Sequence, residues 1–216
     1  LMQKLLTGEV RLPGFDGEWE EVRIKTIGIL KGGNGFPEEY QGNNNGKYPF
    51  YKVSDMNLKE NTKYMSKANN YIDETVKNKL NVNIIPKNSI IFAKVGAALL
   101  LERKRILKVD SCIDNNMMGL TVDCENNDYL FIYYILLNTK ISKICNMGAL
   151  PSLNAKDVYA IKIFIPKSLQ EQKAIAQILT TSDKEIDLLT QELEQLKLQK
   201  KGLMQLLLTG IIRVKC

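Results

Sequence analysis

The sequence predicts an α+β protein, in which a β-rich globular domain with long loops precedes one long α-helix that forms an intermolecular coiled coil. Residues 15–165 hold short apolar runs separated by Gly, Pro and Asn clusters, as in strands joined by turns. Residues 169–209 contain no Pro and one Gly, and their apolar residues recur every three or four positions. That spacing is typical of coiled-coil helices.

Six runs are candidate strands: residues 21–30, 48–54, 89–96, 97–102, 118–122 and 160–165. One helix is expected over residues 128–146, because large apolar side chains recur there at helical spacing. The loops between these elements are long, and such loops commonly carry binding residues.

The long helix has a recognisable start and a narrow apolar seam. Ser168 can cap it, Glu171 stands at the matching position of a capping box, and Pro166 ends the strand before it. With Ser182 and Lys200 as polar members, the seam consists of Ile175, Leu179, Ile186, Leu189, Leu193, Leu196, Leu203 and Leu207. A seam this narrow fits a second helix better than a sheet, so we expect a dimer interface there.

Composition excludes several kinds of chemistry. The chain has no histidine, which removes Ser-His-Asp and Cys-His catalysis, HNH-type nucleases and imidazole-dependent zinc sites. Its four cysteines have no CxxC spacing, so we expect no metal site. The net charge of +6 is a modest indication of a polyanionic partner. No apolar run reaches the ~18 residues of a membrane span, and we expect a cytoplasmic protein.

Three motifs resemble enzyme signatures without completing them. GNNNGKY at 42–48 has three residues between its glycines and Tyr48 after its Lys, whereas a phosphate loop needs four and a Ser or Thr. GGNG at 32–35 is too short for a dinucleotide fingerprint. ERK at 102–104 has Asp73 as its nearest upstream Asp, too distant to complete a metal-dependent nuclease site. We therefore expect no catalytic residue.

The last part of the chain resembles a known family. IFIPKSLQEQKAIAQIL at 163–179, followed by a long helix ending in GLMQLLLTG, is similar to the conserved region of the specificity subunit of Type I restriction-modification enzymes. GEWEEVRIKTIG, YPFYKVSDM, IIFAKVGAA, DNNMMGL and GALPSLNAKDV also appear in that family's usual order. The chain departs from the family in having one recognition domain where most members have two, and Lys94 where an Arg is frequent.

The resemblance implies a subunit that does no chemistry itself. Such a subunit binds a defined double-stranded DNA sequence and docks methyltransferase subunits and, through them, restriction subunits. S-adenosylmethionine, ATP and Mg²⁺ are expected only on those partners, and this chain is expected to need no cofactor. A chain of this size is expected to pair with a second copy through the seam and read a symmetric bipartite target. The alternative is a coiled-coil scaffold or interaction module without DNA recognition.

Three domains follow from the resemblance. Residues 1–14 are the tail of a preceding helical spacer, or an N-terminal docking segment. Residues 15–166 form the DNA target-recognition domain, and residues 167–216 form the coiled-coil spacer.

The expected DNA contacts lie in charged clusters and in the loops that carry the family motifs. Lys and Arg suit phosphate oxygens, and Asn and Arg can read base edges. These residues are Gly33, Asn34, Lys52, Ser54, Asp55, Lys63, Lys94, Arg103, Lys104, Arg105, Asn115, Asn116, Ser152, Asn154 and Lys156. Gly148 and Pro151 are expected to shape the backbone. Because positive charge exceeds negative charge only slightly over residues 15–165, a solvated surface is the alternative for any single cation.

The chain begins with a near copy of its own end. LMQKLLTGEVRL at 1–12 and LMQLLLTGIIRV at 203–214 differ at four positions. Leu1, Met2, Leu5 and Leu6 therefore reproduce the apolar residues of the C-terminal copy. We expect the N-terminal segment to dock near the far end of a coiled coil, with the chain either a natural half-size subunit or a fragment of a longer one.

Overall fold

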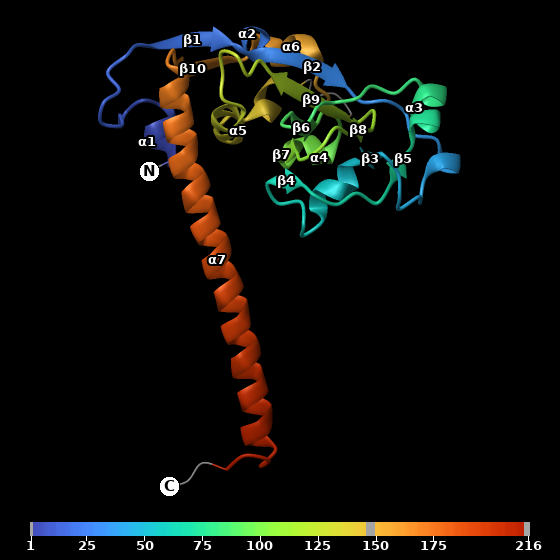
Figure 1. The fold of residues 1–216 in the computed structure, drawn as a ribbon, viewed down its shortest axis with the longest axis vertical. Coiled ribbons are helices and arrows are strands. Elements are labelled where there is room, and N and C mark those ends of the chain that lie inside the picture. Colours follow the sequence, from blue (N-terminus) through green and yellow to red (C-terminus); the bar gives the residue numbers. More distant parts are fainter. Residues whose placement is uncertain (1, 146–149, 214–216) are drawn as a thin grey trace. The chain divides into compact units, whose positions relative to one another are not determined.

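A computed structural model describes residues 2–145 and 150–213 and confirms the α+β class with a long C-terminal helix (Figure 1). The chain divides into two compact units, Leu1–Ala176 and Gln177–Cys216. The first unit extends beyond residue 166 because the first turns of the long helix bury Glu171, Gln172, Ile175 and Ala176. None of the helices within the described residues combines the length and apolarity needed to cross a membrane.

A five-stranded sheet forms the centre of the first unit. In spatial order its strands are β2 (Gly28–Gly32), β9 (Met117–Val122), β6 (Ile90–Ala93), β7 (Lys104–Leu107) and β4 (Tyr64–Met65). Neighbouring strands are antiparallel except β4 and β7, which are parallel. Ile90 and Ile91 on β6 and Ile106 and Leu107 on β7 are completely buried, so these middle strands carry the core.

A three-stranded sheet adjoins it, with the order β5 (Tyr71–Ile72), β3 (Tyr48–Tyr51) and β8 (Cys112–Ile113). Two 3₁₀ turns, η1 (Glu38–Tyr40) and η2 (Val53–Asn57), flank β3 along the chain, and helix α3 (Glu74–Leu80) follows β5. Phe50 on β3 stacks on Phe36 with ring centroids 3.8 Å apart. This packing gives the smaller sheet a core of its own.

A two-stranded ribbon joins the two ends of the globular region. Strand β1 (Trp19–Arg23) pairs antiparallel with β10 (Lys162–Pro166). The one-turn helix α2 (Ile24–Ile27) leads from β1 to β2, and α6 (Ala155–Ala160) packs against it. Helix α5 (Tyr129–Asn138) buries residues 131–136 and contacts both β7 and the N-terminal helix α1 (Met2–Leu6). The ribbon therefore holds the start of the long helix beside the start of the domain.

Several sequence expectations need correction. The run 21–30 is not one strand, because α2 interrupts it between β1 and β2. Residues 97–102, expected as a strand, contain helix α4 (Ala97–Leu100), in which only Leu99 is buried. The helix expected over 128–146 ends at Asn138 and is followed by the 3₁₀ turn η3 (Ile141–Ile144). Asn146 and Gly148 lie outside the described residues. Strands β4, β5, β7 and β8 were not expected.

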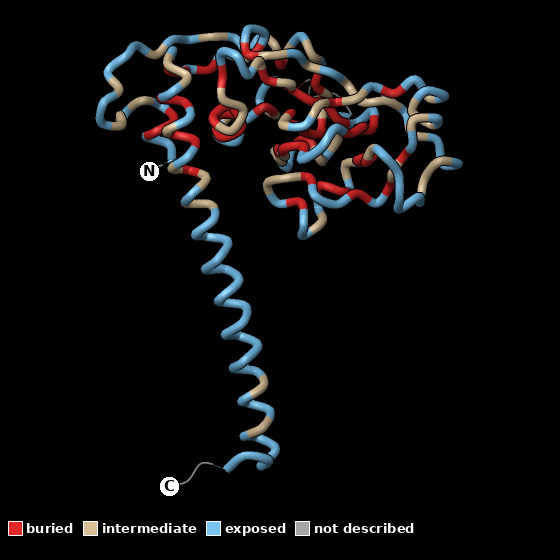
Figure 2. The backbone as a smooth tube through the Cα atoms, viewed as in Figure 1, coloured by how far each residue is buried: buried red, intermediate tan, exposed pale blue. Residues whose placement is uncertain are grey.

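The long helix α7 spans Leu169–Leu208, as the heptad pattern predicts. Its cap is half of the expected box, since Ser168 Oγ accepts from the Glu171 amide at 3.3 Å while the Glu171 side chain binds Arg11 instead. Ile175 and Leu179 are 1% and 5% exposed in the single chain, so the single chain already covers this part of the expected seam, and its place in a dimer interface stays a prediction. Figure 2 shows that most of α7 beyond its first turns is exposed.

Candidate nucleic-acid interface

Strand register brings several of the expected loops to one end of the five-stranded sheet. Gly32 at the end of β2 pairs with Met118 near the start of β9, and Ala93 at the end of β6 pairs with Met117. Lys104, where β7 begins, pairs with Phe92. The loop after β2, the connection between β6 and β7 and the loop before β9 therefore leave the sheet on the same side.

Backbone hydrogen bonds tie these loops together. The Gly33 amide donates to Met117 O at 3.1 Å, and the Lys94 amide donates to Asn116 O at 2.8 Å. Two further bonds add the segment near residue 152, because Gly96 N donates to Pro151 O and Leu153 N donates to Lys94 O. Loops that lie far apart in sequence thus form one connected surface.

Asp55 is a structural residue, and the expectation that it contacts DNA is corrected here. Its side chain is 0% exposed and accepts from the Lys52 amide at 2.7 Å and from the Asn69 side chain at 2.5 Å. Burial raises the pKa of the Asp55 carboxyl, and the hydrogen bonds from Lys52 and Asn69 oppose that shift. Asp114, 7% exposed, accepts from Asn116 N and likewise has a pKa raised by burial. The two carboxylates fix the loops after β3 and β8.

Lys104 is likewise not a contact residue, because it is 1% exposed. Its ammonium forms an ion pair with Glu102 and donates to Thr139 O at 3.0 Å. Burial lowers the pKa of Lys104, and the ion pair with Glu102 opposes that shift. Glu102 also accepts from the amides of Ile141 and Ser142. The pair therefore joins the turn before β7 to η3 after α5.

Arg105 and Lys63 are also held by the fold. Arg105 Nη1 donates to Lys104 O at 2.9 Å, and its Nε donates to Asn61 O. Lys63 Nζ donates to Tyr134 Oη at 2.6 Å and lies 4.6 Å from the centre of that ring. These contacts hold the two cations beside β4 and β7, and since both residues are partly exposed, their contact with DNA stays a prediction.

The other expected residues remain at the surface. Ser54, Asn115, Asn116, Asn154 and Lys156 are exposed, and Gly33, Asn34, Lys52, Lys94, Arg103 and Ser152 are partly exposed. Asn154 also caps α6, accepting from the Asp157 amide at 2.9 Å. We call the set Asn34, Lys52, Ser54, Lys94, Arg103, Asn115, Asn116 and Ser152 the loop-end surface. It offers cationic and amide donors, which suit phosphates and base edges.

Sequence reasoning missed three exposed apolar residues in the same region. Leu100 and Leu101 are 48% and 57% exposed at the end of α4, and Leu150 is 60% exposed. A β-carbon on Gly96 would lie 3.5 Å from a methyl of Leu150, so the two loops touch. The run AALLLE at 97–102 is apolar enough to be a candidate strand, but Ala and Leu are strong helix formers, and that preference could have indicated α4.

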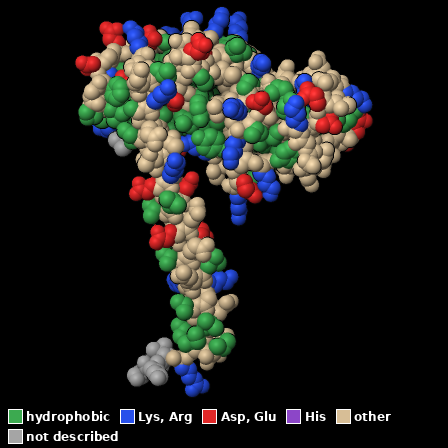
Figure 3. Space-filling view, in the orientation of Figure 1, with side chains coloured by type: hydrophobic (Ala, Val, Ile, Leu, Met, Phe, Trp, Pro, Cys, Tyr) green, Lys and Arg blue, Asp and Glu red, His purple; other side chains and the backbone are tan. Residues whose placement is uncertain are grey.

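The charged side chains of the described residues form no metal-binding cluster, and their signs are mixed. Among the described residues, no group of three or more acidic, Cys or His side chains could hold a metal ion. On the face seen in Figure 3, Lys and Arg side chains are interspersed with Asp and Glu. That face is therefore of mixed charge and not uniformly basic.

Comparison with known proteins gives a consistent result. A family model described as "Type I restriction modification DNA specificity domain" matches residues 16–198. A Methanocaldococcus jannaschii protein assigned as the specificity subunit of type I restriction enzyme MjaX is 39% identical over 106 residues. That match covers 48% of this chain and 25% of that protein.

Solved structures share the fold. An S subunit of a type I restriction-modification system from M. genitalium has a TM-score of 0.61 at 18% identity, over 85% of this chain and 43% of that chain. A chain from a structure of type I R-M complex assembly and conformational transition has a TM-score of 0.67 at 15% identity, over 94% and 48%. This chain therefore spans less than half the length of the relatives it matches.

Proposed function

The chain belongs to the Type I restriction modification DNA specificity domain family, and from that premise we propose that it reads one half of a DNA target through its loop-end surface. The observation that carries this proposal is the gathering of four separate loops at one end of the sheet by strand register and backbone hydrogen bonds. Phosphate contacts from Lys52, Lys94 and Arg103 would position the domain, and the Asn side chains would read base edges.

The chain itself would be non-catalytic. Methyltransferase subunits would bind S-adenosylmethionine and modify adenine, and restriction subunits joined through them would use ATP and Mg²⁺. The chain would determine which DNA sequence the complex binds, and it would bind the methyltransferase subunits. It would do so in the cytoplasm, where those subunits meet DNA.

Two copies of the chain would pair through α7. The exposed part of the seam supports this, because about half of each apolar side chain is open to solvent among the described residues of the single chain. Their exposed fractions are 60% for Ile186, 57% for Leu189, 51% for Leu193, 53% for Leu196, 56% for Leu203 and 45% for Leu207. Covering a Leu or Ile side chain contributes about 1.5–3 kcal/mol. Two-fold pairing would make the DNA target two identical half-sites.

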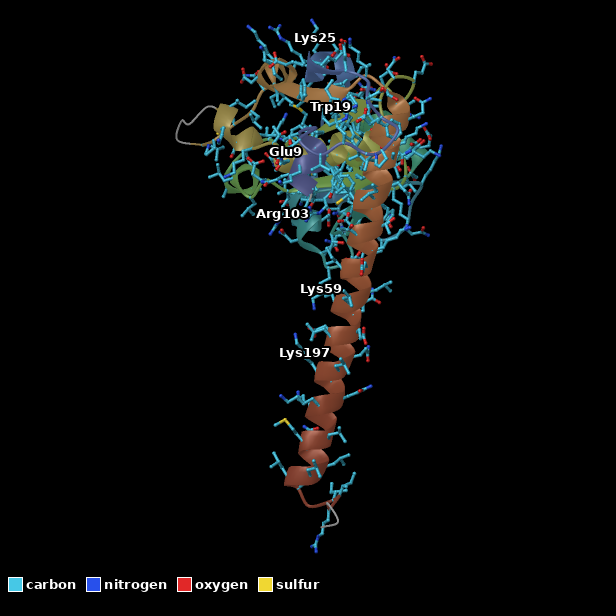
Figure 4. All side chains as sticks on the ribbon, turned by 90° about the vertical axis from the view of Figure 1, so that its left-hand side faces the viewer. Glu9, Trp19, Lys25, Lys59, Arg103 and Lys197 are labelled. Carbon is cyan, nitrogen blue, oxygen red and sulfur yellow. The ribbon has the colours of Figure 1, made fainter. Side chains whose placement is uncertain are left out.

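The test is the methylation pattern of cells that express the chain with its methyltransferase partner. We expect methylated adenines within one bipartite motif, and the loss of that pattern in a Lys94→Glu, Arg103→Glu variant. Lys25 in α2 is the matched control, because it lies at the opposite end of β2 and is exposed (Figure 4). Lys25→Glu should leave the motif unchanged.

Two outcomes would contradict the proposal. Methylation at no particular sequence would favour the alternative, a coiled-coil scaffold without DNA recognition. Equal loss in the Lys25→Glu control would mean that overall charge, and not the loop-end surface, determines binding. Binding should also weaken steeply with salt, because phosphate neutralisation releases counterions.

A further inference from the structure

The two copies of the repeated segment end their helices in the same way. Thr7 N donates to Gln3 O at 3.0 Å, and Thr209 N donates to Gln205 O at 3.1 Å. Both threonine hydroxyls bond the same carbonyls, at 2.9 and 2.6 Å. The glycines that follow, Gly8 and Gly210, have φ values of +73° and +72°, the left-handed conformation of a helix C-terminus.

The agreement continues past the glycines. Val10 N donates to Lys4 O at 3.1 Å, and its counterpart Ile212 N donates to Leu206 O at 3.1 Å. Residues 2–10 and 204–212 are therefore one structural unit present twice, helix end and exit turn included.

The surroundings of the two copies differ. Leu5 and Leu6 in α1 are 2% and 3% exposed, and α1 contacts α5. Their counterparts Leu207 and Leu208 are 45% and 81% exposed. The same apolar face is thus covered at the N-terminus and uncovered at the C-terminus of the single chain.

An ion pair fixes the covered copy in place. Arg11 Nε and Nη2 donate to the two carboxylate oxygens of Glu171 at 2.8 and 3.0 Å, and Trp19 Nε1 donates to the same carboxylate at 3.2 Å. Glu171 is 1% exposed, so this carboxylate depends on its partners. Residue for residue, the C-terminal counterpart of Arg11 is Arg213, which is exposed.

One antiparallel register of two seams leads to the same position. On two antiparallel helices the numbers of facing residues have a constant sum, so Leu189 facing Leu193 of a second copy places Leu207 of that copy opposite Ile175. In the single chain Ile175 is already buried, and α1 lies beside the first turns of α7 (Figure 1). Helix α1 thus stands where the end of an antiparallel α7 would arrive.

We propose that residues 203–213 of a second copy can bind the first unit in the place of α1, with Leu207 and Leu208 replacing Leu5 and Leu6 and Arg213 replacing Arg11 on Glu171. The two segments then compete for one site. This inference rests on the proposed pairing of two copies, and it does not involve DNA, so its failure and the failure of DNA recognition are separately observable.

The single tryptophan reports on this site, because Trp19 contacts Glu171 and lies 3.4 Å from a β-carbon built on Gly8. The experiment titrates a peptide of residues 203–213 into the chain lacking residues 1–12 and into the intact chain, and follows Trp19 emission. We expect binding about ten-fold tighter to the shortened chain. A peptide carrying Leu207→Asp and Leu208→Asp is the control and should not bind. Equal affinity for both chains, or no binding to a folded shortened chain, would overturn the proposal.

A second variant keeps the proposal testable if the shortened chain does not fold. Four substitutions, Lys4→Leu, Glu9→Ile, Val10→Ile and Leu12→Val, give the intact chain an N-terminus identical to its C-terminal copy. We expect this variant to unfold cooperatively at a Tm close to that of the parent. Loss of the cooperative transition would show that the C-terminal sequence does not fit the site.

Discussion

Gly33 passes so close to Asp114 that a β-carbon on Gly33 would lie 2.0 Å from the Asp114 carbonyl oxygen. No side chain fits there, so the approach of the loop after β2 to the loop before β9 requires glycine at this position. The β-carbon built on Gly35, two residues further, has nothing within 4 Å.

Gly33→Ala should therefore lower the free energy of unfolding by about 2 kcal/mol, because the loops must move apart. Gly35→Ala is the control and should change it little. Urea unfolding followed by circular dichroism measures both. Two equally stable variants would mean that the loops separate without cost and that their contact does not define the loop-end surface.

Arg11 should matter more to stability than Arg213, although the two occupy equivalent positions in the repeat. Arg11→Ala removes both hydrogen bonds of a charged donor to the buried carboxylate of Glu171, and we expect a loss of about 2 kcal/mol. Arg213→Ala should leave a dilute, single chain unchanged. Thermal unfolding of the two variants decides this, and an equal effect would show that Glu171 does not depend on Arg11.

The buried carboxylates Asp55 and Asp114 should make stability depend on pH. Burial raises both pKa values, so the folded chain binds more protons than the unfolded chain. Their contribution to stability is therefore full below the unfolded pKa of about 3.9 and is lost as pH rises through the folded pKa.

Asp55→Asn should remove part of that pH dependence. It should also lower the pKa of Asp114, because the charge of Asp55 contributes to raising it. A carbon-detected NMR titration of the Asp114 carboxyl measures the shift, and Asp73→Asn, at an exposed helix cap, is the control. An unchanged Asp114 pKa would mean that the two groups do not interact.

Self-association should depend on the seam and not on apolar residues elsewhere on α7. Leu193→Asp should weaken the dimer by about ten-fold or more, since it places a charge at a position that the partner covers. Leu198→Asp is the matched control, because Leu198 is 62% exposed and lies outside the seam, and it should leave the dimer unchanged. Sedimentation equilibrium of the two variants gives the comparison. A stronger effect at Leu198 would move the interface to another face of the helix.

The sequence predicted those elements whose signal is local. Helix α7 follows from its heptads, and β9 and β10 from short apolar runs. Helix α2 could not be predicted, because the run 21–30 has a continuous strand pattern and only pairing with β9 and β10 separates its halves. Strands β4, β5 and β8 are two residues long, and their pairing with distant segments leaves no periodic signal.

The loops of the candidate site were predictable, but the roles of single residues were not. The cluster 103–105 is basic, and charged side chains are usually exposed. Lys104 is buried because Glu102 and a carbonyl oxygen from the end of α5 surround its ammonium. Such partners are brought together only by folding. The basic cluster therefore indicated the region, but it could not show which cation is exposed and which forms a buried ion pair.

The matching helix ends have a consequence for how such chains can be rearranged. In both copies of the repeat, the helix ends with the same hydrogen bonds and a glycine in the left-handed conformation. A gene cut within one copy and rejoined within the other would therefore encode a polypeptide that leaves its helix in an unchanged direction. Recombination at the repeat could remove or duplicate the whole segment between the copies, and the helix end and the turn after it would keep their structure.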